Sequence, residues 1–404
     1  MRLLLVGAGG LGAAIGLIAA RRDFLELAVV ADSDPRRAED LVAGTGDDRF
    51  VAAKAGRCDQ AAIESLLRQH RCDVLLNTAG VRMVMPLCRA ALKVGVHYVD
   101  TALSMSHPDP EQPYAETGVK LGDDQFALAD RWEAAGLLAL VGMGIQPGLT
   151  DVFARHAADQ LFSTVHEIGV RHGDDLSVAG AGFATPVPVW DTIETYLNPP
   201  VIWERERGWF TTQPFSDPEL FDFPEGIGPV ECVNVEHGGV LLMPRWIDAA
   251  RVGSKRGLGS DVINVLRMLR TLGLDRIDPV KVGDVEVSPR EVVAACLPDP
   301  ADVGDRMTGK TCAGTWVTGS GPDGMPREVF LSHTVDNEWS MATDGVQAMV
   351  WQEAVQPVIA LELIASGAWS GAGVFGPEAF EPGPFLDLLA AHGSSWCHRE
   401  MIPG

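Results

Sequence analysis

A glycine-rich motif near the start of the sequence constrains the fold of this chain more than any other feature. The motif GAGGLG (residues 7–12) follows the apolar run LLLV and precedes a run of small apolar residues, and Asp32 stands at the end of the next apolar run. This order of strand, glycine turn, helix, strand and acidic residue is typical of a dinucleotide-binding βαβ unit. In such a unit the glycines permit a tight turn, a close approach of the backbone to a pyrophosphate, and close packing of the helix on the strand. The motif therefore predicts a dinucleotide site.

Apolar runs alternate with helical patterns as far as about residue 150. The predicted strands are LLLVGAG, ELAVVADSD, RFVAAKAG, CDVLLNTAG, HYVDTA and LLALVGMG, with predicted helices between them. Because these strands are almost continuously apolar, we expect them to be buried on both faces, which is typical of a parallel sheet. The sequence therefore predicts an α/β fold with a Rossmann-type, doubly wound parallel sheet.

The pattern changes after Thr150. One predicted helix, TDVFARHAADQLF, leads into short β-rich runs, and a long helical pattern returns with GVQAMVWQEAVQPVIALELIASG. At about 100–200 residues per domain, the 404 residues suffice for two or three domains. We expect a Rossmann domain at 1–160, an inserted α+β domain at 161–343, and a C-terminal helical segment at 344–404 that returns to the first domain.

Charge and cysteine content exclude several classes of protein. The sequence has 32 basic and 55 acidic residues, a net charge of −23, so nucleic acids and anionic membrane surfaces are poor partners. The seven cysteines are scattered and never in CxxC spacing, which predicts reduced thiols and a cytoplasmic location. The uncharged run from Leu3 to Ala20 has the length of a signal peptide or short membrane span, but the five glycines within it disfavour that alternative.

Asp32 bears on the choice of cofactor. It lies twenty residues after Gly12, where a carboxylate can accept hydrogen bonds from the adenosine ribose hydroxyls. Its charge opposes the additional phosphate of NADP. Arg36 and Arg37 follow and would soften that preference, unless they are only solvated charges in the first turn of a helix. We therefore expect NAD as the cofactor, with NADP binding less well.

Polar and glycine-rich segments follow the later predicted strands, at Asn77–Gly80, His97–Thr101 and Gly142–Gly148. In open α/β sheets, ligands bind outside the carboxyl ends of the strands. These segments therefore indicate where the reactive end of a dinucleotide would lie, although the Gly142–Gly148 segment alone would equally suit a plain turn.

Several motifs together resemble those of the saccharopine dehydrogenase family, which includes lysine 6-dehydrogenase and carboxynorspermidine dehydrogenase. They are GAGGLG, VVADSD, CDVLLNTAG, GVHYVDTA, the G-x-x-P-G-L-T-D loop, IASGAWSGAGVFGPEAF and PFLDLLAAHG. The resemblance implies an NAD(P)-dependent oxidoreductase that acts on the C–N bond of an amino acid or an amino-acid-derived secondary amine, with lysine, saccharopine-like and carboxypolyamine substrates left open. It also implies that the inserted domain binds substrate and forms a homodimer.

The resemblance further implies a set of cofactor-binding residues. The glycine motif would hold the pyrophosphate, the residues near Asp32 and Cys58 the adenosine, and the later strand ends the nicotinamide and its ribose. The expected set is Gly7, Gly9, Gly10, Leu11, Gly12, Asp32, Ser33, Cys58, Asp59, Asn77, Thr78, Gly80, Asp100, Thr101, Gly144, Gln146, Pro147 and Gly148.

Oxidation of a C–N bond requires a base that faces the nicotinamide. Candidates are Tyr98 and Asp100 at a strand end and Glu236 or His237 in the inserted domain; alternatively, Tyr98 covers the sheet and Asp100 binds only a ribose hydroxyl. A substrate carboxylate would need an arginine. The candidates are Arg171, Arg205, Arg245 and Arg251, unless they are surface charges. No histidine spacing predicts a metal site.

Residues 304–311 match the phosphate-loop pattern G-x-x-x-x-G-K-[ST]. A working phosphate loop needs a strand before it and a helix after it, whereas here a β-rich run, GTWVTGSG, follows. We therefore expect no ATPase site around Lys310. A non-catalytic, NAD-binding redox sensor is the remaining alternative to a dehydrogenase.

Overall fold

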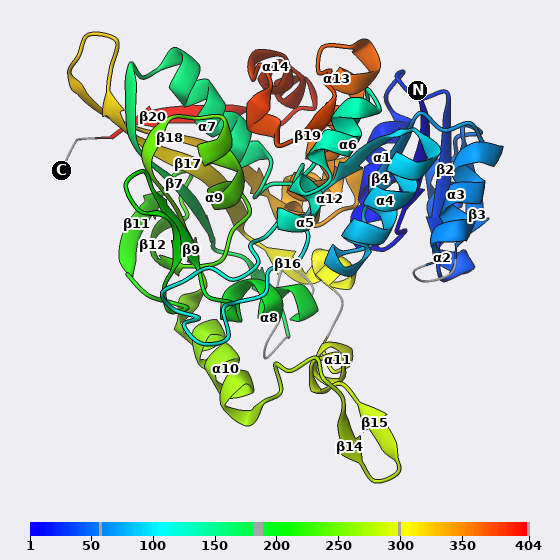
Figure 1. Ribbon diagram of the computed structural model, residues 1–404, viewed down its shortest axis with the longest axis horizontal. Helices are drawn as coiled ribbons and strands as arrows, with labels where there is room; N and C mark the ends of the chain where they lie inside the picture. Colours follow the sequence, from blue (N-terminus) through cyan, green and yellow to red (C-terminus); the bar gives the residue numbers. More distant parts are fainter. Residues whose placement is uncertain (56–58, 181–188, 298–299, 402–404) are drawn as a thin grey trace.

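The computed structural model describes residues 1–55, 59–180, 189–297 and 300–401. It contains two large sheets that lie beside each other, with the first sheet formed mainly by the N-terminal part of the chain (Figure 1). The loops between them carry the candidate site.

The first sheet has seven parallel strands in the order β19-β6-β5-β4-β1-β2-β3, and it contains all six strands predicted from the sequence. One face is covered by α1, α2 and α13, and the other by α3, α4 and α6. The predicted doubly wound α/β fold is therefore confirmed. The strands are β1 (Arg2–Val6), β2 (Leu27–Asp32), β3 (Phe50–Lys54), β4 (Val74–Asn77), β5 (His97–Asp100), β6 (Leu138–Leu140) and β19 (Gly373–Phe375). The helices are α1 (Gly10–Ala20), α2 (Pro35–Thr45), α3 (Gln60–Gln69), α4 (Val84–Val94), α5 (Asp123–Phe126) and α6 (Ala129–Ala134).

The second sheet is mixed and has nine strands. Its main path is β10-β9-β13-β7-β17-β18-β20, with β12 also pairing with β13, and β11 pairing with β12. Only the β13–β7 pair is parallel within it. The strands are β7 (Thr164–Asp174), β9 (Val201–Glu204), β10 (Gly208–Thr211), β11 (Glu219–Phe223), β12 (Gly228–Asn234), β13 (Ala249–Gly257), β17 (Lys310–Ser320), β18 (Pro326–Asp336) and β20 (Trp396–Glu400).

Helices and two small two-stranded sheets complete the part of the chain beyond β6. The hairpin of β14 and β15 projects from the body beside α11 (Figure 1). The helices are α7 (Leu149–Gln160), α8 (Val189–Leu197), α9 (Gly239–Leu242), α10 (Gly259–Leu272), α11 (Pro289–Ala295), α12 (Asn337–Asp344), α13 (Ala348–Ser366) and α14 (Gly383–Ala391). The small strands are β8 (Ser177–Val178), which pairs with β16 (Met307–Thr308), and β14 (Val280–Val282), which pairs with β15 (Val285–Val287).

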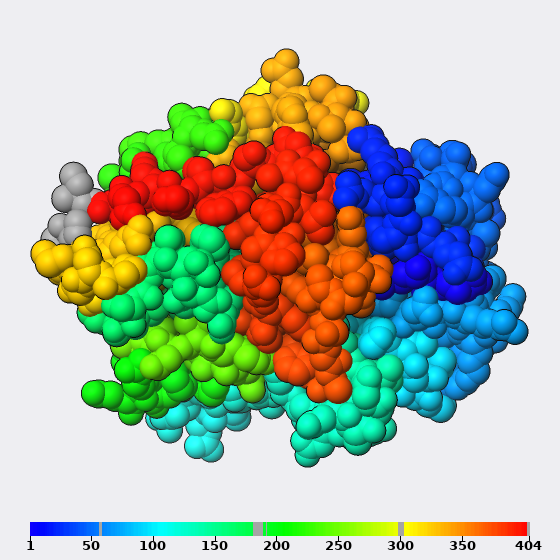
Figure 2. Space-filling view, turned by 90° about the horizontal axis from the view of Figure 1, so that it is seen from above, coloured from blue at the N-terminus to red at the C-terminus, as the bar shows by residue number. Residues whose placement is uncertain are grey.

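The C-terminal residues lie between the two sheets. Strand β19 extends the first sheet beside β6, whereas β20 extends the second beside β18. Figure 2 shows these residues, in orange and red, between the blue N-terminal region and the green and yellow residues of the second sheet. Helix α13 is long and apolar enough to cross a membrane by length and composition alone, but 72% of its 18-residue apolar window is buried inside the protein.

Candidate active site

The glycine motif forms a turn that leaves backbone N–H groups free. Gly7 has φ +107°, and a Cβ on Gly12 would lie 1.9 Å from the carbonyl oxygen of Gly7. Gly9, by contrast, has nothing within 4 Å of its Cβ position, and no side chain caps the N-terminus of α1. A pyrophosphate needs space to approach the backbone closely, and it needs free N–H groups at a helix N-terminus to bind its oxygens. This turn provides both. The predicted residues Gly7, Gly9, Gly10, Leu11 and Gly12 therefore fit a dinucleotide.

A pocket of about 690 Å³ lies beside this turn, at the carboxyl ends of β1, β2 and β4. Asp32 lines it, and its carboxylate accepts hydrogen bonds from the backbone N–H groups of Ala8 (2.8 Å) and Asp34 (2.8 Å). The pocket has the position expected for the adenosine half of a dinucleotide. Its lining residues are Val6, Gly7, Gly9, Asp32, Ser33, Arg37, Ala55, Ile63, Thr78, Ala79 and Met83.

Two further residues, Cys58 and Asp59, are predicted to lie near the adenine. Cys58 lies outside the described residues. Asp59 does not line the pocket, because it is the N-cap of α3 and its side chain accepts a hydrogen bond from the N–H of Ala62 at 3.0 Å. Asp59 therefore stabilises the start of a helix.

The segment after β4 leads from this pocket towards a second one. Thr78 donates a hydrogen bond to the carbonyl oxygen of Gly7 at 2.7 Å, and Asn77 accepts one from the N–H of Ala79 at 3.0 Å. Thr78 and Ala79 line the adenosine pocket, whereas Val81, directly after Gly80, lines the second.

The second pocket, of about 740 Å³, lies between the first domain and the inserted domain. The predicted residues Thr101, Gln146, Pro147, Glu236 and His237 all line it. The complete set is Val81, Thr101, Ala102, Leu103, Met105, Leu121, Gln146, Pro147, Glu194, Thr195, Tyr196, Val235, Glu236, His237 and Gly238. Glu194 and Tyr196 come from α8 and are not among the predicted site residues. Nothing in their local sequence pattern indicates a contact with the first domain.

The Gly144–Gly148 loop forms one wall of this pocket. Gly148 has φ +133°, and a Cβ there would lie 1.9 Å from the carbonyl oxygen of Gly144. Beneath the loop, the buried Glu353 carboxylate accepts a hydrogen bond from the N–H of Ile145 at 2.9 Å, and Asp151 accepts one from the N–H of Gly148 at 2.9 Å. Burial raises the pKa of Glu353 to about 7. These contacts hold the loop in place against the pocket.

Asp100 and Tyr98 do not line the pocket, which corrects their prediction as catalytic groups. Both are fully buried. The Asp100 carboxylate accepts hydrogen bonds from the N–H of Gly142 (2.9 Å) and from Gln125 (2.8 Å), and burial raises its pKa to about 7. The Tyr98 hydroxyl donates to the carbonyl oxygen of Val84 at 3.2 Å. Both side chains thus hold the sheet edge from below, and both oxygens of Asp100 accept hydrogen bonds from the protein.

Two of the predicted base candidates, Glu236 and His237, line the pocket. The Nδ1 of His237 accepts a hydrogen bond from the N–H of Gly239 at 2.9 Å, and its Nε2 has no hydrogen-bond partner among the described residues. Burial, assisted by the charge of Arg256, lowers the pKa of His237 to about 3. The ring is therefore neutral, and since Nδ1 is an acceptor, Nε2 carries the proton. His237 presents an unused N–H donor beside Gly238, whose backbone lies against Pro147.

The four arginines predicted to bind a substrate carboxylate do not line the pocket. Each has a contact elsewhere: Arg171 with Glu219, Arg205 with Asp248, Arg251 with Glu204, and Arg245 over the ring of Phe126. Arg171 and Arg251 face away from the pocket because side chains alternate along a strand, so that their neighbours His172 and Val252 face inward. The inward-facing Arg256 is buried beneath Tyr196, with its guanidinium 5.8 Å from the ring centroid and its Nε without a partner.

Residues 304–311 do not form a phosphate loop. Met307–Thr308 form β16, and Lys310 begins β17 where a phosphate loop would require a helix. The Lys310 ammonium donates a hydrogen bond to the carbonyl oxygen of Glu225 at 3.2 Å. The described residues also contain no group of three or more metal-ligating side chains placed to hold a metal ion.

Two models of one protein family together match nearly the whole chain. Residues 3–140 match the family model described as saccharopine dehydrogenase NADP binding domain, and residues 144–394 match the saccharopine dehydrogenase C-terminal domain.

Two curated relatives align with all of this chain and 98% of their own lengths. Carboxynorspermidine synthase of Vibrio cholerae is 27% identical over 417 residues, and carboxyaminopropylagmatine dehydrogenase of Synechocystis sp. is 26% identical over 414 residues.

The solved structure of apo saccharopine dehydrogenase (L-Glu forming) from Saccharomyces cerevisiae has the same fold. It superposes with a TM-score of 0.70 over 99% of this chain and 100% of that chain, at 13% identity. Since the two family models together span most of the chain and the first domain has a nicotinamide-dinucleotide site, the protein belongs to the saccharopine dehydrogenase family and is an oxidoreductase.

Proposed function

We propose that the protein transfers a hydride between a nicotinamide cofactor and the C–N bond of a secondary amine that joins an amino-acid carbon chain to a diamine. The names of the two curated relatives support a carboxylated polyamine of this kind. Lysine and saccharopine-like substrates are the alternatives within the family.

The charge of the second pocket is the observation that favours a carboxylated polyamine over lysine or saccharopine. Its described lining residues include two carboxylates, Glu194 and Glu236, and neither arginine nor lysine. A pocket with this composition attracts cationic amines and disfavours a substrate rich in carboxylates. A polyamine chain fits that charge better than a dicarboxylate such as saccharopine. Arg256, which is buried beneath Tyr196 and lies 3.6 Å from the Asp174 carboxylate, is a candidate to balance the single carboxylate of the amino-acid portion.

The chemistry requires few protein groups. The cofactor, when bound, supplies the hydride acceptor or donor. Oxidation removes a hydride from carbon and a proton from nitrogen, and water then hydrolyses the resulting imine to a carbonyl compound and a primary amine. His237 is placed to donate its Nε2–H to a polar atom of the substrate near the reacting bond, beside the Gly144–Gly148 loop. Leu103, Leu121 and Val235 form an apolar part of the pocket wall.

The most direct test is the reverse reaction, in which an aldehyde and a primary amine are joined reductively to form the secondary amine. The carboxyaminopropyl group in the name of one relative corresponds to L-aspartate 4-semialdehyde as its aldehyde. Mixing this aldehyde with 1,3-diaminopropane or agmatine and the reduced cofactor is expected to consume the cofactor and to yield the carboxylated amine, identified by mass spectrometry. Turnover with lysine or saccharopine and the oxidised cofactor, but not with these pairs, would contradict the proposed substrate.

NAD is expected to bind more tightly than NADP. The buried carboxylate of Asp32 is held in the adenosine pocket by two backbone hydrogen bonds, whereas Arg37, which lines the same pocket, is exposed and long. The fixed negative charge should outweigh the mobile positive one at the ribose 2′ position. Titration of both cofactors measures the preference, and Asp32→Ser should reverse it. Equal or reversed affinities in the unmodified protein would refute this prediction.

We also propose a cytoplasmic homodimer that associates through the inserted domain. The six described cysteines are free, consistent with a reducing compartment.

Large apolar side chains are exposed on α10 and on the projecting hairpin, among them Leu272 (63%), Val282 (57%) and Val285 (59%). Since an isolated two-stranded hairpin is barely stable in water, contact with a second subunit would explain them. Sedimentation at micromolar concentration is expected to give a dimer, which Val282→Asp should weaken; a monomeric parent protein would contradict this.

A further inference from the structure

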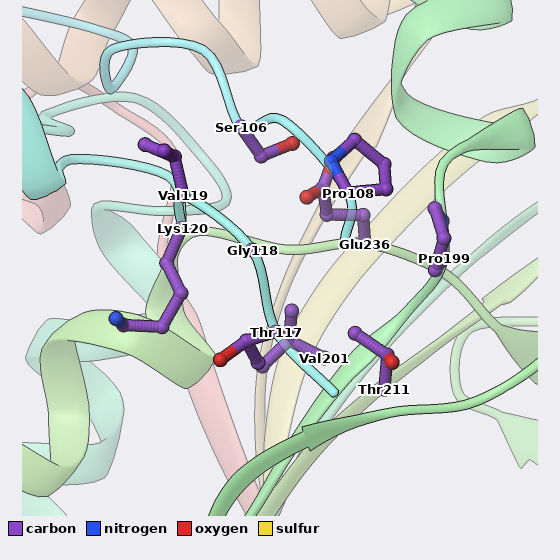
Figure 3. A pocket seen from close by; sticks show the side chains of 10 residues that line it. All are labelled: Ser106, Pro108, Thr117, Gly118, Val119, Lys120, Pro199, Val201, Thr211 and Glu236. Carbon is purple, nitrogen blue, oxygen red and sulfur yellow. The ribbon is translucent and has the colours of Figure 1, made fainter. Parts of the chain in front are cut away.

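Glu236 lies where two pockets meet. It lines the large pocket that contains His237, and it also lines a smaller one of about 230 Å³ on its other side. The smaller pocket is formed by the loop after β5 and by the inserted domain (Figure 3). Its lining residues are Ser106, Pro108, Thr117, Gly118, Val119, Lys120, Pro199, Val201, Thr211 and Glu236. Glu236 thus closes one side of the large pocket.

The Glu236 carboxylate is held in one orientation. It is only 4% exposed, it accepts a hydrogen bond from the Asn198 amide at 3.0 Å, and the Ser106 hydroxyl also hydrogen-bonds to it. The same amide of Asn198 donates to Glu194 at 3.1 Å, so that the two carboxylates lie on either side of one donor. Burial raises the pKa of Glu236 to about 7, with the charge of Glu194 adding to the shift.

Glu236 differs from its neighbours because no described cation pairs with it. Glu194 forms an ion pair with Arg290, which also lies over the ring of Trp190. Lys120, across the smaller pocket, forms an ion pair with Asp123 at 3.0 Å, and its ammonium points away from Glu236 in Figure 3. A buried carboxylate without a counter-ion is costly, which is why its pKa is raised, and a cation that reaches it would stabilise the charged form.

An independent feature of the same pocket indicates a ligand. The adjacent residue, His237, is 5% exposed and has an unpartnered Nε2. The pocket is thus lined by His237, which has an unused donor, and by Glu236, which has no described counter-ion. A chain with a polar reacting centre and a cationic end would satisfy both groups at once.

We propose that Glu236 is the residue that selects the substrate, by binding the distal cationic group of the diamine portion while the reacting C–N bond lies beside His237. This inference rests on the proposed function. The ammonium would replace the missing counter-ion of Glu236, and Asn198 and Ser106 hold the carboxylate in place to receive it. The preferred amines are therefore aliphatic chains with a second cationic group, and monoamines are discriminated against.

The test compares two amines of the same chain length, 1,3-diaminopropane and propylamine, each with L-aspartate 4-semialdehyde and reduced cofactor. The unmodified protein is expected to favour the diamine, in kcat/KM, by about 100-fold. Glu236→Gln keeps the size and the acceptor oxygen but removes the charge, so it should lower kcat/KM for the diamine by about 100-fold and leave propylamine almost unchanged. Glu231→Gln, on an exposed position of β12, is the matched control and should change neither value.

Calorimetric titration of 1,3-diaminopropane into the protein with cofactor gives a readout independent of turnover. Binding that is lost in Glu236→Gln and kept in Glu231→Gln supports the inference even if the aldehyde proves to be the wrong partner. An equal loss for both amines in Glu236→Gln, or diamine binding that survives the substitution, would overturn it. If no amine is turned over but the diamine binds through Glu236, the proposed reaction fails and the assignment of this residue stands.

Discussion

Substitution of Gly12 by alanine is expected to reduce cofactor affinity by at least about 100-fold. The added Cβ would lie 1.9 Å from the carbonyl oxygen of Gly7 and 2.9 Å from its carbonyl carbon, both backbone atoms that no side-chain rotation can move. Either α1 shifts away from β1 or the turn that precedes it changes shape. Both outcomes displace the uncapped N–H groups of α1 from the pyrophosphate. Fluorescence titration with reduced cofactor measures the loss.

Gly44→Ala is the matched control for this substitution. Gly44 lies inside α2, and the nearest atom to its Cβ position is a Leu17 side-chain carbon at 4.0 Å. Alanine is expected to be tolerated there and to leave cofactor affinity unchanged, because it favours helix and meets no obstacle. Cofactor affinity of Gly12→Ala within twofold of the parent protein would refute the assignment of this turn.

Replacement of His237 by alanine is expected to lower kcat by about 100-fold with little change in cofactor affinity. The imidazole belongs to a residue that lines the pocket, and its Nε2 has no hydrogen-bond partner among the described residues. Its low pKa means that the neutral ring donates a hydrogen bond over the whole range in which the protein would be assayed. The pH dependence of kcat should therefore show no ionisation of this histidine near neutrality.

Two further variants separate loss of the donor from loss of packing. His237→Gln retains an N–H donor of similar reach and should keep more activity than His237→Ala. His166→Ala removes an exposed imidazole from β7 and should have no effect. Parent-like kcat in His237→Ala, or equal losses in the alanine and glutamine variants, would show that the hydrogen bond plays no part in turnover.

The sequence predicts the first domain well because its signals are local. The six strands of residues 1–150, the turn at residues 7–12 and the loop at Gly144–Gly148 follow from apolar runs, glycines and their order along the chain. The sequence does not predict which way a side chain points at the end of a strand, because its position along the chain does not determine which surroundings it faces. Tyr98 and Asp100 lie two residues apart and both point into the protein, whereas Thr101 reaches the pocket.

The pocket residues of the inserted domain could be predicted only in part. Glu236 and His237 follow a short β-rich run that ends in polar residues, which is a visible signal. Glu194 and Tyr196 belong to an amphipathic helix whose contact with the loop after β5 depends on how the two domains meet. The arginines are chemically equal in the sequence, and only the alternation along β7 and β13 places Arg256 on the opposite face of the sheet from Arg171 and Arg251.

The position of β19 and β20 also has a consequence for biosynthesis. The first sheet takes its edge strand from residues 373–375, and the second takes one from residues 396–400. An emerging chain can therefore form the glycine turn early, but neither sheet acquires its full set of strands until these distant segments have been synthesised. Such long-range pairing slows folding and leaves strand edges exposed in nascent intermediates. We infer that the two domains mature together rather than one after the other.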